Sequence, residues 1–262
     1  MKELETKNRQ NIQAEKDLHE QKFFVDSGHW TSHPLLMSRE RYWLKYEVEK
    51  IRFYGYLYRY MEKKPYKNKA KILLAPIGDG SDLKYLQGMY REVWGIDISP
   101  AQLSKCPGTI IKKEGDILKS GYEDESFDII IVSLFLHHLY GVDMGPFMDE
   151  FKRLLRKGGT IAFLEPSSMH PFNRTVRLVE KFLGAFPGKV KDERPISPVY
   201  VKRLLKNAGF QNVRIHGMSF NHIAYPFFIQ SLANTIDPLF RAFWPIKFFS
   251  ATIGFFCEKP MI

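Results

Sequence analysis

The sequence predicts an α/β protein in which helices pack on both faces of a doubly wound, mostly parallel sheet. Two observations support this fold class. Five short runs rich in Ile, Leu and Val alternate with helical patterns between residues 71 and 165, as expected for buried strands joined by right-handed crossovers. The chain has 262 residues, of which 44% are hydrophobic, so it can build one large domain with additions.

Residues 1–65 are predicted to form a helical lead-in ahead of the main domain, which spans residues 66–262. Residues 1–38 are polar with scattered aromatics, and they suit either a lid or a tail. Ser38–Met61 carries aromatic and aliphatic residues at spacings of three and four, which predicts one long amphipathic helix. A lysine-rich segment then ends it.

The main domain contains runs with the composition of strands and patterns with the period of helices. The predicted strands are Lys71–Pro76, Glu92–Asp97, Thr109–Lys113, Phe127–Leu134, Thr160–Glu165, Phe210–Ile215 and Phe248–Cys257. The predicted helices are one that starts near Leu83, Met144–Arg156, which Lys157, Gly158 and Gly159 close, and Pro198–Ala208.

Residues 218–247 interrupt this alternation and form an aromatic-rich insertion. From Ser219 to Phe256 there are eleven aromatic residues in 38 and only three charged ones. Such a segment needs a cover, which its own domain, a lipid or bound substrate, or a second copy of the chain can provide.

Composition narrows the class of function. The only two cysteines, Cys106 and Cys257, are 151 positions apart, so we expect neither a disulfide framework nor a cysteine-based metal site. The histidines have no carboxylates at ligand spacing, and we expect no metal. A polar amino terminus and the lack of a long apolar run predict a soluble, cytoplasmic protein. The net charge of +10 suits a polyanion, an anionic membrane surface or simple solubility.

A glycine-bearing loop follows the first predicted strand. Gly78 and Gly80 allow positive φ angles and a close approach of the backbone to a ligand. Asp97 ends the second strand nineteen residues after Gly78, where open α/β nucleotide sites place a carboxylate on the ribose hydroxyls. Asp116, after the third strand, lies at the same predicted edge. The loop and Asp97 together indicate a nucleotide-like cofactor.

These motifs resemble the class I S-adenosylmethionine-dependent methyltransferases, of the small-molecule, type 11-like branch. The resemblance covers residues 71–217 and rests on ILLAPIGDGSDL, EVWGIDISPAQL, KKEGDILKSGYEDESFDIIIVSLFLHHL and FKRLLRKGGTIAFLEPS. It implies a Rossmann-like seven-stranded sheet with an antiparallel last strand, S-adenosylmethionine as cofactor and S-adenosylhomocysteine as product. The cofactor-binding residues that it implies are Pro76, Gly78, Asp79, Gly80, Asp97, Ile98, Gly115, Asp116, Ile117 and Ser133.

The glycine loop departs from the family pattern at its start. Leu74 stands where relatives usually carry an acidic residue, and Pro76 stands at the first glycine. Pro76 fixes φ and removes a backbone donor, which predicts an altered loop shape. The lost carboxylate weakens cofactor binding unless Asp79 or Asp82 compensates for it from within the loop.

Catalysis by such an enzyme is mostly positioning, with a general base where the acceptor is a hydroxyl. His137 and His138 follow the fourth strand at the carboxyl edge, where they serve the acceptor or pack locally. Glu165 ends the fifth strand and is expected to point into the same crevice. These three residues are the predicted catalytic groups.

The resemblance therefore implies in-line methyl transfer to oxygen or nitrogen of a small or lipid- or sugar-linked acceptor, with peripheral membrane contact. It also implies that residues 218–247 cover the acceptor. The basic stretch Arg174–Lys191 suits anionic headgroups or forms a solvated face. Two alternatives stay open: a catalytically degenerate module that binds membrane or RNA, and an NAD-dependent oxidoreductase. Leu83 at the third glycine position disfavours the oxidoreductase, and the motif after the fourth strand disfavours DNA-base methylation.

Overall fold

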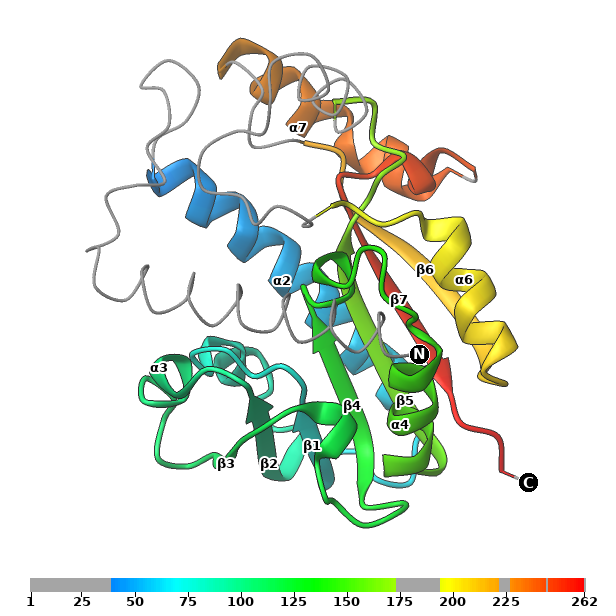
Figure 1. The fold of residues 1–262 in the computed structure, drawn as a ribbon. Helices are drawn as coiled ribbons and strands as arrows, with labels where there is room; N and C mark the ends of the chain where they lie inside the picture. Colours follow the sequence, from blue (N-terminus) through cyan, green and yellow to red (C-terminus); the bar gives the residue numbers. More distant parts are fainter. Residues whose placement is uncertain (1–38, 173–193, 222–226, 244, 262) are drawn as a thin grey trace.

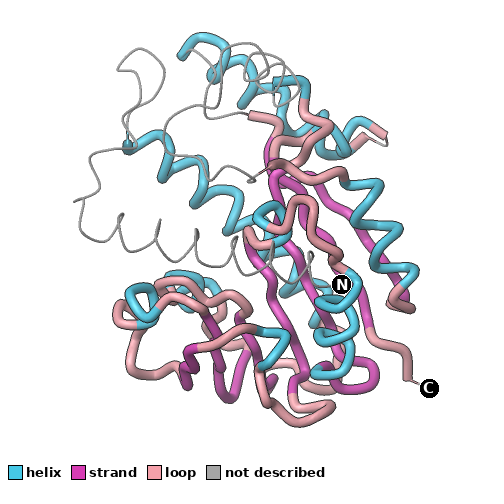
Figure 2. The backbone as a smooth tube through the Cα atoms, viewed as in Figure 1, coloured by secondary structure: helices cyan, strands magenta, loops and turns pink. Residues whose placement is uncertain are grey.

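The computed structural model describes residues 39–172, 194–221, 227–243 and 245–261. Its centre is a seven-stranded sheet in the order β3-β2-β1-β4-β5-β7-β6, with helices on both faces (Figures 1 and 2). The predicted α/β fold class is confirmed. The strands are β1 (Ala70–Leu74), β2 (Tyr90–Asp97), β3 (Ile111–Glu114), β4 (Phe127–Ser133), β5 (Leu155–Pro166), β6 (Gln211–Ser219) and β7 (Thr252–Glu258).

Strand directions agree with the predicted topology. The pairs β3–β2, β2–β1, β1–β4 and β4–β5 are parallel, whereas β7 runs antiparallel to both β5 and β6. The chain winds outward from β1 to β3 and then returns to place β4 on the other side of β1. This reversal creates a switch point at the carboxyl ends of β1 and β4, where open α/β sheets bind ligands.

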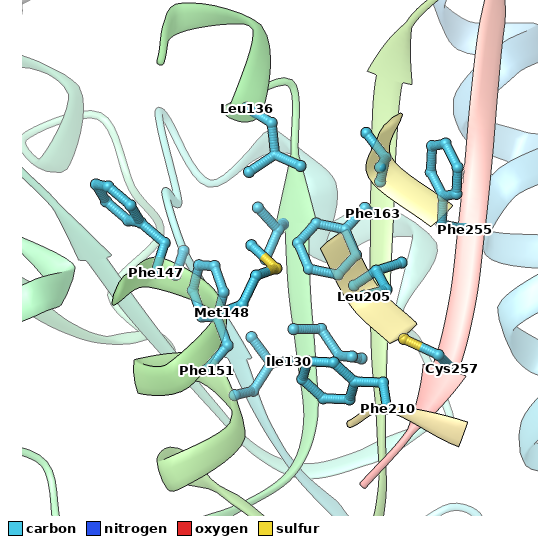
Figure 3. Close-up of a cluster of buried hydrophobic side chains, with 14 of the residues drawn as sticks. Ile130, Leu136, Phe147, Met148, Phe151, Phe163, Leu205, Phe210, Phe255 and Cys257 are labelled. Carbon is cyan, nitrogen blue, oxygen red and sulfur yellow. The ribbon is translucent and has the colours of Figure 1, made fainter. Parts of the chain in front are cut away.

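One face of the sheet is covered by α4 (Gly145–Leu154) and α6 (Pro198–Asn207). Alternate strand residues such as Ile130 and Phe163 point toward these helices and meet Phe151 and Leu205 in a fully buried cluster (Figure 3). The helices form because apolar residues recur at spacings of three and four on one side. The predicted helix Pro198–Ala208 ends one residue earlier than expected.

The opposite face is covered by α2 (Arg39–Met61), which lies ahead of the sheet in the chain. Phe53 and Leu57 are fully buried and pack in one cluster with Ile72, Ile131 and Phe256, the strand residues that point away from α4 and α6. The predicted helix Ser38–Met61 is thus confirmed to within one residue. Its packing makes it part of the hydrophobic core.

The crossovers on the β3 side of the sheet are short. The helix expected near Leu83 is only the 3-10 helix Ser81–Tyr85, so that prediction is wrong in type and length. All four residues of β3 are exposed, contrary to the predicted burial on both faces, because this edge strand pairs with β2 alone. Strand composition does not distinguish an edge from a centre.

Several predicted boundaries also differ from the observed ones, and two of them change the type of an element. Lys157, Gly158 and Gly159 lie inside β5 and do not close a helix, because α4 ends at Leu154 and the strand begins directly after it. The last strand begins at Thr252, later than the predicted Phe248, because Ile246–Phe249 forms a 3-10 helix.

The aromatic insertion contains α7 (Phe227–Ala242), which runs between the end of β6 and the start of β7 (Figure 1). This connection places α7 at the carboxyl edge of the parallel strands. No helix within the described ranges is both long and apolar enough to cross a membrane. The predicted lead-in 1–38, the basic stretch 174–191 and part of the insertion lie outside the described residues.

Candidate functional site

The glycine loop leaves β1 at the switch point. Gly78 and Gly80 have φ angles of 57° and 74°, which favour glycine because a side chain would be strained there. A Cβ atom on Gly80 would lie 2.9 Å from Pro107 Cδ, so the loop packs tightly against the segment after the second strand. A Cβ atom on Gly78 would meet nothing within 4 Å. Gly78 therefore marks the side of the loop that a ligand can approach.

Asp97 at the end of β2 is bonded to this loop. Its Oδ2 accepts a hydrogen bond from the Gly78 backbone N–H at 2.8 Å, and its Oδ1 accepts one from the Ser99 N–H at 2.9 Å. The residue is only 6% exposed. A carboxylate has about four acceptor positions, so it can also accept from a ribose diol. The structure thus brings together the glycine loop and the acidic residue, as expected from their spacing.

The residues predicted to surround an adenine lie at the same edge. The Gly115 N–H donates to the Asp97 carbonyl at 2.9 Å, which places the turn after β3 beside the end of β2. Asp116 accepts from the Leu118 N–H at 2.9 Å and caps a short 3-10 helix. Ile117 is buried and Ile98 half-buried. Contact of these residues with an adenine remains a prediction.

The altered part of the loop is apolar at its start. Leu74 is 2% exposed and packs in the α2 cluster, so it faces the core. Pro76 is half-buried, and Asp79 is exposed and accepts a hydrogen bond from the Ser81 N–H at 3.0 Å. Asp82, by contrast, is turned toward α2.

The partner of Asp82 is Lys50, a residue for which sequence reasoning predicted no role. Lys50 Nζ lies 2.6 Å from Asp82 Oδ2 and 2.6 Å from the Oγ of Ser133, which ends β4. The Lys50 side chain is 3% exposed. A signal was present in the sequence: Lys50 lies three and seven positions before Phe53 and Leu57, on the apolar side of the predicted helix.

Glu165 is fully buried and faces the turn after β4. Its Oε1 accepts from the Phe135 and Leu136 N–H groups at 2.9 and 2.7 Å, and its Oε2 lies 2.9 Å from His137 Nδ1. A proton on Nδ1 makes Nε2 the basic nitrogen of His137. The His137 and His138 rings lie against each other with centroids 4.1 Å apart. Glu165 therefore orients His137, and an acceptor contact by either residue remains a prediction.

No group of His, Cys, Asp or Glu in the described part of the chain could hold a metal ion. His137 and Glu165 form a hydrogen-bonded pair with the chemistry of a general base, and the His138 ring lies against His137.

The family model for a methyltransferase domain matches residues 75–163. The matched residues run from the end of β1 into β5 and contain the glycine loop, Asp97, Ser133 and the histidine pair. Residues 75–163 thus match a methyltransferase domain. The chain is 30% identical over 135 residues to the probable methyltransferase ltbC of Aspergillus luteorubrus, covering 44% of this chain and 47% of the relative.

A further relative of the methyltransferase domain is an uncharacterized methyltransferase of Anoxybacillus flavithermus, 31% identical over 97 residues, 36% of this chain and 46% of that one. The chain thus spans about half the length of these curated relatives.

Solved structures share the fold of the methyltransferase domain. One, from Thermotoga maritima, is described as a SAM-dependent methyltransferase and possible histamine N-methyltransferase; it has a TM-score of 0.60 and 16% identity over 84% of this chain and 93% of its own. The [4+2]-cyclase SpnF has a TM-score of 0.54 and 15% identity, with 81% and 82% covered. At such identities, the likeness concerns the fold.

Proposed function

We propose that this protein uses S-adenosylmethionine to methylate an oxygen or nitrogen atom of a small or lipid- or sugar-linked acceptor. The observation that carries the proposal is the bonding of Asp97 to Gly78 within a methyltransferase domain. It holds a carboxylate beside the open side of the glycine loop, at the carboxyl edge of β1 and β2.

The residues present fit this cofactor. Asp97 offers acceptors for the ribose hydroxyls, and Gly78 leaves room beside the loop because no protein atom lies within 4 Å of the point that a Cβ atom would occupy. Gly115, Asp116 and Ile117 form the neighbouring wall for the adenine. When bound, S-adenosylmethionine supplies an electrophilic methyl group on sulfur.

The protein's own contribution is to position the acceptor and to handle its proton. Glu165 holds His137 through Nδ1, so Nε2 is the nitrogen that can accept a proton from an acceptor hydroxyl or ammonium. His137 is only 7% exposed, which limits water near the reacting atoms.

An acceptor with an apolar part is supported by α7. Leu232, Leu239 and Phe243 are 62%, 61% and 59% exposed, and their spacing of seven and four places them on one face of the helix and its end. The helix α7 and the proposed site lie at the same carboxyl edge of the sheet. A lipid tail or a membrane surface suits such a face.

Calorimetric titration with S-adenosylmethionine, S-adenosylhomocysteine and NADH tests the cofactor. We expect micromolar binding of the first two, none of NADH, and a loss of at least tenfold in affinity in Asp97→Asn, because the amide donates where a carboxylate accepts. Asp143→Asn is the matched control, since Asp143 is exposed and its side chain accepts a hydrogen bond from the Gly145 N–H at the start of α4. Wild-type protein that binds none of these ligands would contradict the proposal and favour a binding module.

Transfer itself needs a second readout, because a cyclase has the same fold. Incubation with methyl-labelled S-adenosylmethionine and a panel of hydroxyl- and amine-bearing lipids and sugars should yield labelled product. We expect His137→Ala to lower the rate of transfer about 100-fold or more while cofactor affinity stays the same. A rate of transfer equal to that of the wild type would show that His137 takes no part in the reaction.

A further inference from the structure

A buried lysine enters the site from outside the region that resembles the family. Lys50 belongs to α2, whereas the family model begins at residue 75. Its ammonium bridges Asp82, two residues after Gly80, and Ser133 at the end of β4, at 2.6 Å from each. Lys50 thus connects the 3-10 helix that follows the glycine loop with the end of β4.

A carboxylate and two tyrosines surround this ammonium. Asp82 Oδ2 accepts from Lys50 Nζ and also from the Tyr54 hydroxyl at 2.7 Å. Burial and the Asp82 charge raise the pKa of Tyr54 well above its ordinary value, so its hydroxyl remains a donor. The Tyr46 ring lies 5.2 Å from Lys50 Nζ and adds a cation–π contact.

Docking of α2 does not explain this arrangement. Phe53 and Leu57 already fix the helix through fully buried apolar contacts. A buried ion pair is often no more stabilising than apolar residues of the same volume, because both charges lose water. Lys50 Nζ donates two hydrogen bonds to protein atoms of the described chain, and an ammonium group can donate three. A ligand with a negative charge would use this remaining capacity.

The proposed cofactor ends in a free amino acid, which carries an ammonium and a carboxylate group. Relatives usually provide an acidic residue at the position of Leu74, but here that side chain is apolar and buried in the core. An anion for the cofactor ammonium must therefore come from elsewhere, and Asp82 is the half-buried carboxylate closest in sequence to the two loop glycines on the α2 side.

We infer that Lys50 and Asp82 bind the amino-acid end of S-adenosylmethionine, Lys50 through its carboxylate and Asp82 through its ammonium group. Ser133 orients the Lys50 ammonium at the end of β4. The zwitterionic pair of protein side chains matches the zwitterionic end of the ligand. This inference rests on the proposed function and assigns one part of its cofactor site to α2.

Two ligands separate this inference from the function itself. S-adenosylhomocysteine and 5′-methylthioadenosine share the adenosine and thioether groups, but only the first carries the amino acid. In calorimetric titrations, Lys50→Met should weaken S-adenosylhomocysteine binding at least tenfold and leave 5′-methylthioadenosine binding unchanged. Asp82→Asn should act in the same direction.

Lys84→Met is the matched control. Lys84 also pairs with α2, through Glu47 at 2.8 Å, but both side chains are exposed, at 53% and 39%. Its loss should change neither affinity. If Lys50→Met unfolds, the double variant Lys50→Met/Asp82→Asn removes both charges, keeps an acceptor for Tyr54 and should restore folding without restoring selectivity for the amino acid.

The outcomes are distinguishable. Wild-type protein that binds neither ligand overturns the proposed function. A second outcome is that wild-type protein binds both ligands, while the Lys50 and Asp82 variants lose affinity for both ligands equally or for neither. This outcome overturns only the assignment of the amino-acid end.

Discussion

At the scale of single residues, Glu165 shows how one carboxylate fixes a reactive group through the backbone. It accepts N–H donors from Phe135 and Leu136 and a hydrogen bond from the His137 ring, all while fully buried. A buried charge is tolerated only when its acceptor positions are filled in this way. The turn after β4 and the orientation of His137 therefore depend on the same side chain.

Glu165→Gln should lower the free energy of unfolding by about 2–4 kcal/mol, because the amide NH₂ group would face backbone donors. Denaturation in urea at pH 7 measures this change. The half-exposed Glu92, which pairs with the exposed Arg91, provides the control, and Glu92→Gln should cost less than about 1 kcal/mol. Equal effects of the two substitutions would show that Glu165 is not tightly bonded in the native protein.

At the scale of elements, the contact between α2 and β6 places an imidazole beside cations. The His216 ring stacks on Tyr56 with centroids 4.0 Å apart. Burial is the main reason that its pKa falls to about 4, and the charges of Lys247, Arg214 and Arg59 lower it further. The neutral ring is therefore the form that fits between the helix and the sheet.

This contact predicts a pH dependence of stability. Between pH 6.5 and 4 the unfolded chain binds a proton at His216 that the folded chain does not, so the free energy of unfolding should fall as pH falls through this window. His216→Phe should reduce that fall, as measured by urea denaturation from pH 7.5 to 4. Above pH 7 the free energy of unfolding should depend on pH in the same way in the variant and in the wild type. A variant that loses as much stability on acidification as the wild type would contradict the prediction.

At the scale of the whole molecule, Asp237 joins three parts of the chain. Its Oδ2 accepts from Arg52 of α2 and Arg241 of α7, each at 2.8 Å, and its Oδ1 accepts from the Phe220 N–H beyond β6. Arg52 also donates to the Met218 carbonyl at 2.7 Å. The helix that covers the sheet and the helix of the aromatic insertion are thereby held by one buried carboxylate, 2% exposed.

Asp237→Asn should destabilise the protein by about 3 kcal/mol and raise hydrogen exchange in α7, because two arginines lose their charged partner. Hydrogen exchange read by mass spectrometry should show no change in β4 and β5. Asp124→Asn, at an exposed ion pair with Arg153, should leave α7 unchanged. Unaltered exchange in α7 of the Asp237 variant would show that other contacts fix this helix.

The sequence was informative where local pattern decides the outcome. Runs of Ile, Leu and Val located the central strands, and the spacing of Gly78 and Asp97 brought two distant groups to one edge. The exposure of β3 escaped prediction because edge and central strands share a composition. The hydrogen bonds of Glu165 to the turn after β4 and the reach of Lys50 into the site escaped it, because both depend on packing between segments far apart in the chain.

The position of α2 also decides which piece of the chain can fold alone. A fragment that starts at Ala75, where the family likeness begins, lacks both β1 and α2. The surface that carries Ile131, Leu164 and Phe256 would then be open to water, and an apolar area of this kind promotes aggregation. The autonomous folding unit is therefore longer than the region of family likeness and includes α2 and β1.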